Sequence, residues 1–152
     1  MSRGFGPAPA RVRTAYPGVR LAVWIWTGPW ARISAMGKSV LIVDDHPSFR
    51  ASARRMLEAD GYDVVGEAAD GASAIEAARE LQPEVVLLDI RLPDVDGFQV
   101  AERLAANGAA PAIVLTSSRD RSDFGYEIDD CPAHGFIPKS ELSAGAIASL
   151  VT

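Results

Sequence analysis

The stretch that decides the fold is Val85-Val86-Leu87-Leu88-Asp89, four consecutive apolar residues followed by one carboxylate. A strand that is apolar at every position, rather than at alternate positions, is typical of a parallel sheet covered by helices on both faces. The turn sequence Leu92-Pro93-Asp94-Val95-Asp96-Gly97 follows shortly after it. Because ligands of open α/β sheets bind at the carboxyl ends of the strands, we expect Asp89 to be a site residue.

The chain on either side alternates apolar runs with helical patterns. Four further strands are predicted, at residues 39–43, 62–68, 111–115 and 135–137. Helices are predicted at 47–59, 71–81, 98–106 and 142–151, with a weaker helical segment at 119–131 that Gly125 interrupts. Short crossovers of this kind are right-handed and give an α/β fold. We therefore predict a doubly wound, five-stranded parallel sheet with helices on both faces.

The first 37 residues differ in composition from the rest. They contain five of the fifteen basic residues, no acid, all three tryptophans and four of the ten prolines. Their apolar part, at 19–30, is interrupted by Gly28-Pro29 and is shorter than the roughly 20 residues of a membrane helix. We interpret residues 1–37 as a basic, disordered extension, with Met36 as the natural start, before a domain at 38–152. A surface-binding tail and an export signal are the alternatives.

The charge and cysteine content restrict the function of residues 38–152. This part has ten basic and twenty acidic residues, a balance that disfavours nucleic acid as a partner and favours cations. The single cysteine, Cys131, excludes an internal disulfide and suits a reducing, cytoplasmic compartment. Cys131 and His134 alone are too few ligands for a zinc site.

Polar side chains end four of the predicted strands. They are Asp44 and Asp45, Asp89, Thr116, and Lys139. In a doubly wound sheet these ends converge on one crevice. Grouped carboxylates repel one another and hold a hard cation such as Mg²⁺, while a hydroxyl and an ammonium suit phosphoryl oxygens. The pattern predicts phosphoryl transfer to an aspartate, although helix caps and surface charges are the alternatives for each residue taken alone.

The residues at these strand ends resemble one known family, the receiver domains of two-component response regulators. The resemblance covers about residues 38–152 and lies in four segments: Val43-Asp44-Asp45-His46-Pro47, Leu87 to Gly97, Leu115-Thr116-Ser117, and Gly135-Phe136-Ile137-Pro138-Lys139-Ser140. It implies a flavodoxin-like sheet of order 2-1-3-4-5. It also implies a histidine kinase or phosphotransfer protein as partner, and a homodimer linked to phosphorylation.

The resemblance also implies roles for individual residues. Asp89 would be the phosphoacceptor, and Mg²⁺ would be held by Asp45, Asp89 and the backbone carbonyl of Arg91, with help from Asp44. Thr116 and Lys139 would contact the phosphoryl group.

Phe136 falls where the family has its switch aromatic, which would act together with Thr116. The chain departs from the family at Ser140, where a proline often follows the lysine, and in the acidic segment at 119–131.

About a dozen residues follow the last predicted strand, which favours a single-domain regulator similar to those of chemotaxis, without an output domain or enzyme activity of its own. Two alternatives remain open. One is a small Mg²⁺-dependent phosphatase that uses the same aspartate, Asp89. The stretch Asp94-Val95-Asp96 resembles the D-x-D motif of such phosphatases, but it follows a proline turn and not a strand. The other is a receiver-like interaction module that is never phosphorylated.

Overall fold

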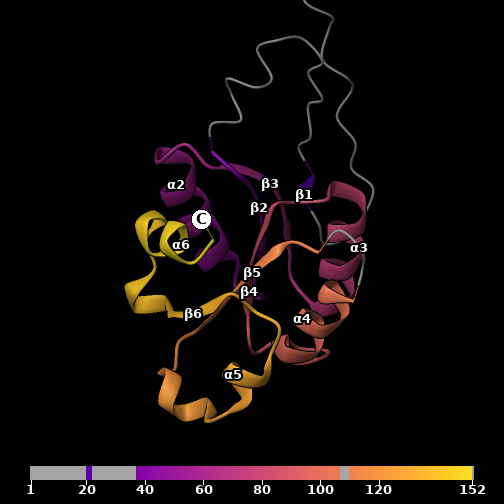
Figure 1. The fold of residues 1–152 in the computed structure, drawn as a ribbon. Helices are drawn as coiled ribbons and strands as arrows, with labels where there is room; N and C mark the ends of the chain where they lie inside the picture. The colour runs from indigo at the N-terminus through magenta and orange to yellow at the C-terminus, as the bar shows by residue number, and fades with distance from the viewer. Residues whose placement is uncertain (1–19, 22–36, 107–109, 152) are drawn as a thin grey trace, which may run out of the picture.

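The computed structural model describes residues 20–21, 37–106 and 110–151 (Figure 1). The predictions of a disordered extension, a surface-binding tail or an export signal concern the rest of residues 1–36 and lie outside the described residues. Within the described ranges, no helix is long and apolar enough to cross a membrane.

One sheet of six strands forms the centre of the molecule. The strands are β1 (Arg20–Leu21), β2 (Ser39–Val43), β3 (Asp63–Ala68), β4 (Val85–Asp89), β5 (Ala112–Ser117) and β6 (Gly135–Pro138). Their order is β1-β3-β2-β4-β5-β6, and every pair from β3 to β6 is parallel. Strands β2 to β6 are the five predicted ones in the predicted flavodoxin-like order, with β4 at the centre.

Helices cover both faces of the sheet, as the uninterrupted apolar pattern of β4 predicts. They are α2 (Pro47–Ala59), α3 (Gly71–Leu81), α4 (Gly97–Ala105), α5 (Glu127–Asp130) and α6 (Ala144–Val151), with 3₁₀ turns η1 (Arg121–Phe124) and η2 (Lys139–Glu141). Figure 1 shows α2 and α6 on one side of the sheet and α3 and α4 on the other. Asp70 and Asp96 cap α3 and α4 by accepting hydrogen bonds from Ser73 N and Gln99 N.

Alternate residues of β2, β4 and β5 enter two separate cores. In β4, Val86 and Leu88 pack with α3 and α4, whereas Val85 and Leu87 pack with α2 and α6. All four side chains are fully buried. A strand in this position cannot shift its register without placing apolar groups wrongly on both faces, so the position of Asp89 at its end is strongly specified.

The sequence did not predict β1, a sixth strand. Its two residues pair antiparallel with β3, with Arg20 opposite Glu67 and Leu21 opposite Gly66. This pairing covers the outer edge of β3 at the side of the sheet that lies farthest from β6.

The segment at 119–131, here called the η1–α5 lobe, is less regular than the rest. The turn η1 and the helix α5 have four residues each and are separated by Gly125 and Tyr126. The φ of Gly125, +57°, lies in the left-handed region that favours glycine. The predicted interruption at Gly125 is therefore confirmed. In Figure 1 the lobe, drawn in orange, lies next to β6 at the lower end of the molecule.

Candidate functional site

The predicted site residues meet at the carboxyl edge of the sheet. Asp89 is the last residue of β4 and pairs in register with Thr116 of β5. Asp44 follows β2 directly, and Lys139 follows β6 at the start of η2. Because β2, β4, β5 and β6 are parallel neighbours, their ends bring these four side chains to one edge, as the sequence predicts.

Lys139 joins the two buried carboxylates of the site. Its Nζ lies 2.6 Å from Asp44 Oδ2 and 3.5 Å from Asp89 Oδ2. The Asp44 and Asp89 side chains are 0% and 5% exposed. The contact with Asp44 is an ion pair without hydrogen-bond geometry, so Asp44 Oδ2 has no hydrogen bond within the described chain. The ammonium also lies 4.5 Å from the centre of the Phe49 ring, which restrains it further.

The surroundings of Asp89 favour its protonated form. Burial, followed by the charge of Asp44, raises the pKa of Asp89 to about 6. The ammonium of Lys139 and a hydrogen bond of 3.3 Å from Arg91 N to Asp89 Oδ1 act in the opposite direction. A cation placed beside Asp89 would stabilise the carboxylate and lower this pKa.

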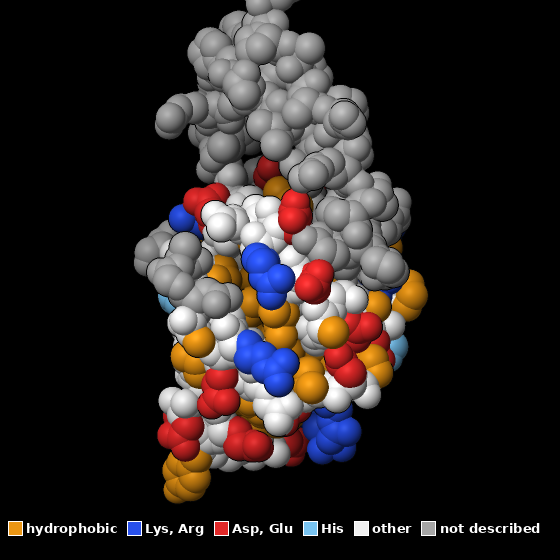
Figure 2. Space-filling model, turned by 90° about the vertical axis from the view of Figure 1, so that its right-hand side faces the viewer, with side chains coloured by type: hydrophobic (Ala, Val, Ile, Leu, Met, Phe, Trp, Pro, Cys, Tyr) orange, Lys and Arg blue, Asp and Glu red, His pale blue; other side chains and the backbone are white. Residues whose placement is uncertain are grey.

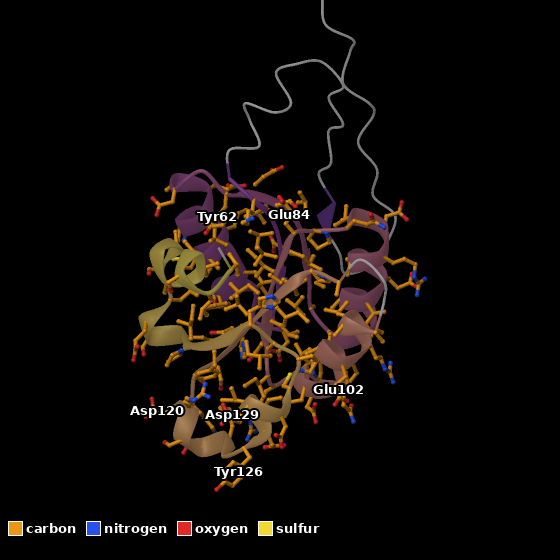
Figure 3. The ribbon with its side chains drawn as sticks, viewed as in Figure 1. Tyr62, Glu84, Glu102, Asp120, Tyr126 and Asp129 are labelled. Atoms are coloured by element: carbon orange, nitrogen blue, oxygen red, sulfur yellow. The ribbon has the colours of Figure 1, made fainter. Side chains whose placement is uncertain are left out.

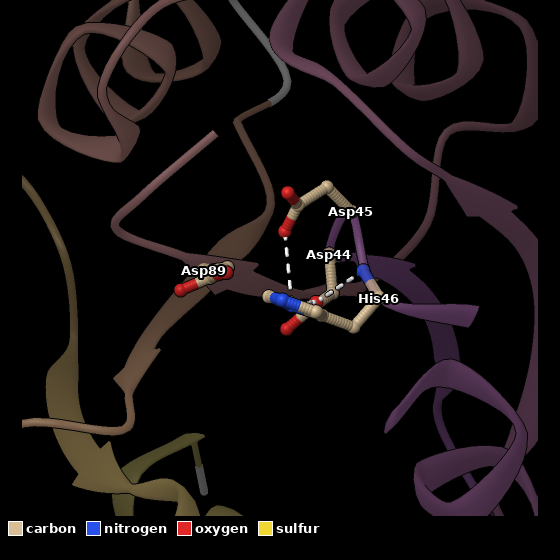
Figure 4. Close-up of side chains that lie close together, drawn as sticks. All are labelled: Asp44, Asp45, His46 and Asp89. Carbon is tan, nitrogen blue, oxygen red and sulfur yellow. Dashed lines mark hydrogen bonds and ion pairs between the residues drawn. The ribbon is translucent and has the colours of Figure 1, made fainter. Parts of the chain in front are cut away.

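Asp45 and His46 complete the acidic end of the site (Figure 4). The Asp45 side chain is 36% exposed, and His46 Nδ1 lies 3.0 Å from an oxygen of each acid of the pair. Ligand atoms of Asp44, Asp45, His46 and Asp89 all lie within 4.8 Å of one another. The three carboxylates fit Mg²⁺, because this ion takes oxygen ligands and because the single ammonium of Lys139 does not balance three negative charges. When bound, Mg²⁺ neutralises charge on transferring phosphoryl oxygens.

Thr116 has a hydroxyl that is buried without a partner. The residue is 0% exposed, and no group in the described part of the chain hydrogen-bonds to its Oγ1 atom. A buried unsatisfied hydroxyl is costly, so this atom is suited to a ligand oxygen next to Asp89.

Phe136 lies one strand away from Thr116 and belongs to a row of three aromatic rings. Its ring centre is 5.8 Å from that of Phe124 in η1, which in turn is 6.1 Å from that of Phe98 in α4. The Phe98–Phe124 contact is edge-to-face and the Phe124–Phe136 contact is tilted, and ring pairs at these distances attract each other. The row links β6 to the η1–α5 lobe and to the start of α4.

The sequence did not predict a network of ion pairs that lies behind the acidic pair. Arg50 of α2 donates from Nη1 to the backbone carbonyl of Asp44 at 2.6 Å and from Nε to Glu67 of β3 at 3.0 Å. Arg54 Nε donates to the other Glu67 oxygen at 2.7 Å. Burial raises the pKa of Glu67, but the hydrogen bonds from Arg54 and Arg50 outweigh it and leave this pKa below its usual value. The available signal was an acid inside an apolar strand, which requires a paired cation.

The D-x-D stretch has a structural role. Asp94 accepts hydrogen bonds from Gly71 N at 2.8 Å and Ala72 N at 3.0 Å, so it caps α3 from a distant loop. Asp96 caps α4. Neither contact resembles a catalytic arrangement, and the similarity to a phosphatase motif loses its support. Gly97 is required for close packing, since a Cβ there would lie 2.5 Å from the Asp89 carbonyl oxygen.

A cavity of about 430 Å³ adjoins the site between α4 and the η1–α5 lobe. Phe98 and Phe124 form part of its wall, and Arg91 and Arg119 are among its charged lining residues. Ile90, Arg91 and Leu92, which follow Asp89, also line this cavity.

Comparison with known proteins agrees with this geometry. Residues 40–150 match the family model of the response regulator receiver domain. A Pseudomonas aeruginosa protein named for transcriptional regulation is 37% identical over 102 residues, which are 67% of this chain and 49% of that protein. The DNA-binding transcriptional activator EvgA of Escherichia coli K12 is 30% identical over 112 residues, 74% of this chain and 55% of EvgA. The chain thus spans about half the length of the curated relatives it matches.

Solved structures give the same result. The signal receiver domain of NarL from Mycobacterium tuberculosis has a TM-score of 0.68 and 34% identity, covering 75% of this chain and 96% of that one. A LuxR-family response regulator from Aurantimonas sp. SI85-9A1 has a TM-score of 0.69 and 30% identity, covering 76% and 85%. The family binds Mg²⁺ at an acidic pocket and receives phosphoryl groups from histidine kinases or phosphotransfer proteins. By fold, site and sequence, this chain belongs to the response regulator receiver domain family.

Proposed function

We propose that the chain is phosphorylated on Asp89 in a Mg²⁺-dependent reaction and that this modification switches its contacts with other proteins. The observation that carries the proposal is the position of Asp89. Its carboxylate is buried at the end of the central strand, between the acidic pair and Lys139, and next to the unpartnered hydroxyl of Thr116. Mg²⁺ would be held by Asp44, Asp45, Asp89 and the backbone carbonyl of Arg91.

In the proposed reaction, an oxygen of Asp89 attacks the phosphorus of a phosphohistidine on a kinase or phosphotransfer protein. An O–P bond forms, the P–N bond breaks, and the imidazole leaves with a proton. Lys139 stabilises the negative charge that develops on the phosphoryl oxygens, and Thr116 donates its hydroxyl proton to one of them. The reaction requires the carboxylate form, so it should slow as the pH falls, and bound Mg²⁺, which lowers the Asp89 pKa, should move this loss to a lower pH.

The switch would act through Thr116 and Phe136. Once Thr116 moves toward the phosphoryl group, Phe136 can turn into the space that it leaves. The contact of Phe136 with Phe124 supports a link to the η1–α5 lobe. Because phenylalanine has no hydroxyl to fix a turned-in state, packing alone must stabilise it, and a modest population shift follows.

The relatives suggest what the switch controls. EvgA and the Pseudomonas protein are named for transcriptional regulation, and both extend beyond the part that this chain matches. Regulation of transcription is therefore a proposal for any protein that contains this receiver. The predicted absence of a nucleic-acid partner and the single-domain arrangement stay predictions. We also propose that residues 38–152 are the folding unit.

Incubation with acetyl phosphate and Mg²⁺, followed by intact-mass measurement, tests the proposal. Wild-type protein should gain one phosphoryl group, and a chelator should prevent the gain. Asp89→Asn should gain none, whereas Asp94→Asn, a matched aspartate outside the site, should be labelled like wild type. Labelling of Asp89→Asn at another residue would disprove the assignment.

A further inference from the structure

The aromatic ring of Phe49 lies beside Lys139, where the proposed function gives it no role. Phe49 is the third residue of α2, which begins at Pro47. Its ring centre is 4.5 Å from Nζ of Lys139, the first residue of η2. The Phe49 side chain is half-buried and packs against the core that also contains residues of α2 and α6. It therefore connects this core to the ammonium of the site.

The Lys139 ammonium has neighbours of two kinds. Carboxylate oxygens of Asp44 and Asp89 lie 2.6 Å and 3.5 Å from Nζ, and the Phe49 ring lies under it. A lysine has a flexible four-carbon stem, so its neighbours determine where the ammonium stays. The face of an aromatic ring attracts a cation, most strongly where water is excluded. Because the Lys139 side chain is only 18% exposed, solvent weakens this attraction little.

The two kinds of neighbour differ in their charge during the proposed reaction. Asp44 would share its charge with Mg²⁺, and Asp89 would give up its charge when its oxygen bonds to phosphorus. Both changes weaken the attraction of these carboxylates for the ammonium. The Phe49 ring has no charge to lose, so its attraction for the ammonium persists. The ring is therefore suited to keep Nζ in place while the phosphoryl oxygens arrive.

We propose that Phe49 is a positioning residue that holds the Lys139 ammonium beside Asp89 for the transferring phosphoryl group. It acts through Lys139 and does not touch the reacting atoms. The inference rests on the proposed function for the chemistry that Lys139 performs. Packing alone would require only an apolar side chain, because the core around Phe49 is aliphatic, with residues such as Leu57 and Ile147. The aromatic ring is needed for the ammonium.

The first measurement is the rate at which acetyl phosphate and Mg²⁺ label the full chain, followed by intact mass over time. Phe49→Leu keeps an apolar side chain without a ring and should slow labelling about three- to tenfold. Phe49→Tyr restores a ring and should stay within about twofold of the wild-type rate. The control is Met56→Leu, two turns further along α2 in the same core, which should be labelled at the wild-type rate.

A double variant shows whether Phe49 acts through Lys139. Lys139→Ala should itself slow labelling, and adding Phe49→Leu should slow it no further, since no ammonium is left to position. Equal slowing by Phe49→Leu in both backgrounds would overturn the proposal, because packing alone would then explain it. A wild-type rate in Phe49→Leu, or equal slowing in Phe49→Tyr, would also overturn it. Thermal melting checks that the variants fold, and Phe49→Met is a second replacement without a ring, with the same expected result.

Nuclear magnetic resonance of the metal-free protein tests the contact without any reaction. The chain has two lysines, Lys38 and Lys139, so lysine-selective labelling gives two sets of signals, which Lys139→Ala assigns. Protons over the face of a ring are shielded, so the Lys139 Cε protons should be shifted upfield in wild type and Phe49→Tyr but not in Phe49→Leu. The same Lys139 signals in wild type and Phe49→Leu would overturn the proposal. Failure of acetyl phosphate to label wild type would instead refute the proposed function and leave this comparison unaffected.

Discussion

The carboxyl edge of the sheet and the η1–α5 lobe are built in different ways. At the sheet edge, Asp44 and Asp89 are buried and stand at the ends of two central strands. In the lobe, η1 has no buried residue and α5 has one, Ile128, while Tyr126 is 82% exposed and points away from the domain (Figure 3). Figure 2 shows acidic side chains gathered at the lower end of the molecule, where the lobe lies.

This difference indicates that the phosphorylation chemistry and the response to phosphorylation belong to different parts of the molecule. The site is positioned by strands that are apolar on both faces, so its geometry resists change. A segment with few buried apolar groups opens or rearranges at a lower free-energy cost than the core. We therefore expect the chemistry to depend on the fixed edge and the response to phosphorylation to appear in the lobe.

The largest expected effect compares one buried aliphatic residue from each region. Leu88→Ala should lower the free energy of unfolding by about 3–5 kcal/mol, because the cavity that it leaves lies between strands and helices that cannot collapse. Ile128→Ala should cost under about 2 kcal/mol, since a four-residue helix at the surface can adjust to the loss. Urea denaturation followed by circular dichroism measures both. Equal losses would show that the lobe is part of the rigid core.

The next effect concerns the free-energy cost of burying the ionised carboxylate of Asp89. The folded pKa of about 6 exceeds the usual value of 3.8, so between these values the folded state binds more protons than the unfolded state. In metal-free buffer, stability should consequently rise as the pH falls from about 7 to 4. Asp89→Asn should remove this contribution and stabilise the protein at pH 7.5 by about 1–3 kcal/mol.

Added Mg²⁺ should reverse the order of stability, since it stabilises wild type and not Asp89→Asn. Melting temperatures at several pH values, with and without Mg²⁺, give the test. A variant that melts below wild type in chelator at pH 7.5 would contradict the raised pKa. The Glu67 carboxyl changes stability with pH in the opposite direction. Its lowered pKa gives stability that is lost only as the pH falls below about 4.5.

A smaller effect distinguishes the two arginines on Glu67. Arg50→Ala and Arg54→Ala should each cost about 2 kcal/mol, less than for a fully unpaired buried charge, because the other guanidinium still pairs with Glu67. Only Arg50 also contacts the carbonyl of Asp44. Calorimetry should therefore show weaker Mg²⁺ binding, by about three- to tenfold, in Arg50→Ala alone. Equal Mg²⁺ affinities in the two variants would mean that Arg50 has only a structural role.

The smallest effect is the switch itself. Hydrogen exchange should change in the η1–α5 lobe, β6 and α6 when beryllofluoride, a mimic of the phosphoryl group, binds with Mg²⁺. Phe124→Leu should reduce the change in the lobe, because it removes the ring between Phe136 and Phe98. If exchange changed only in the loops around Asp45 and Asp89, the lobe would not be part of the response.

The sequence was sufficient for the five parallel strands and their polar ends. Apolar runs such as 85–88 permit few assignments other than a buried parallel strand. A residue that directly follows such a run must lie at the edge of the sheet. The Arg50–Glu67 contact was harder to predict, because it joins a helix to a strand 17 residues away and depends on how α2 packs on β3. The row of Phe98, Phe124 and Phe136 depends on a loop conformation that no periodic pattern encodes.

The pairing of β1 with β3 determines how copies of this molecule can associate. An uncovered strand offers a row of free amides and carbonyls to any other chain, and this is how sheets grow into larger assemblies. Here one border of the sheet is occupied by the molecule's own Arg20–Leu21, and the other is a four-residue strand whose last residue, Pro138, has no amide hydrogen to donate. Continuous sheets between copies are thereby disfavoured at both borders. A chain that begins at Met36 would lack β1. The border along β3 would then be exposed, and the protein would become more prone to self-association.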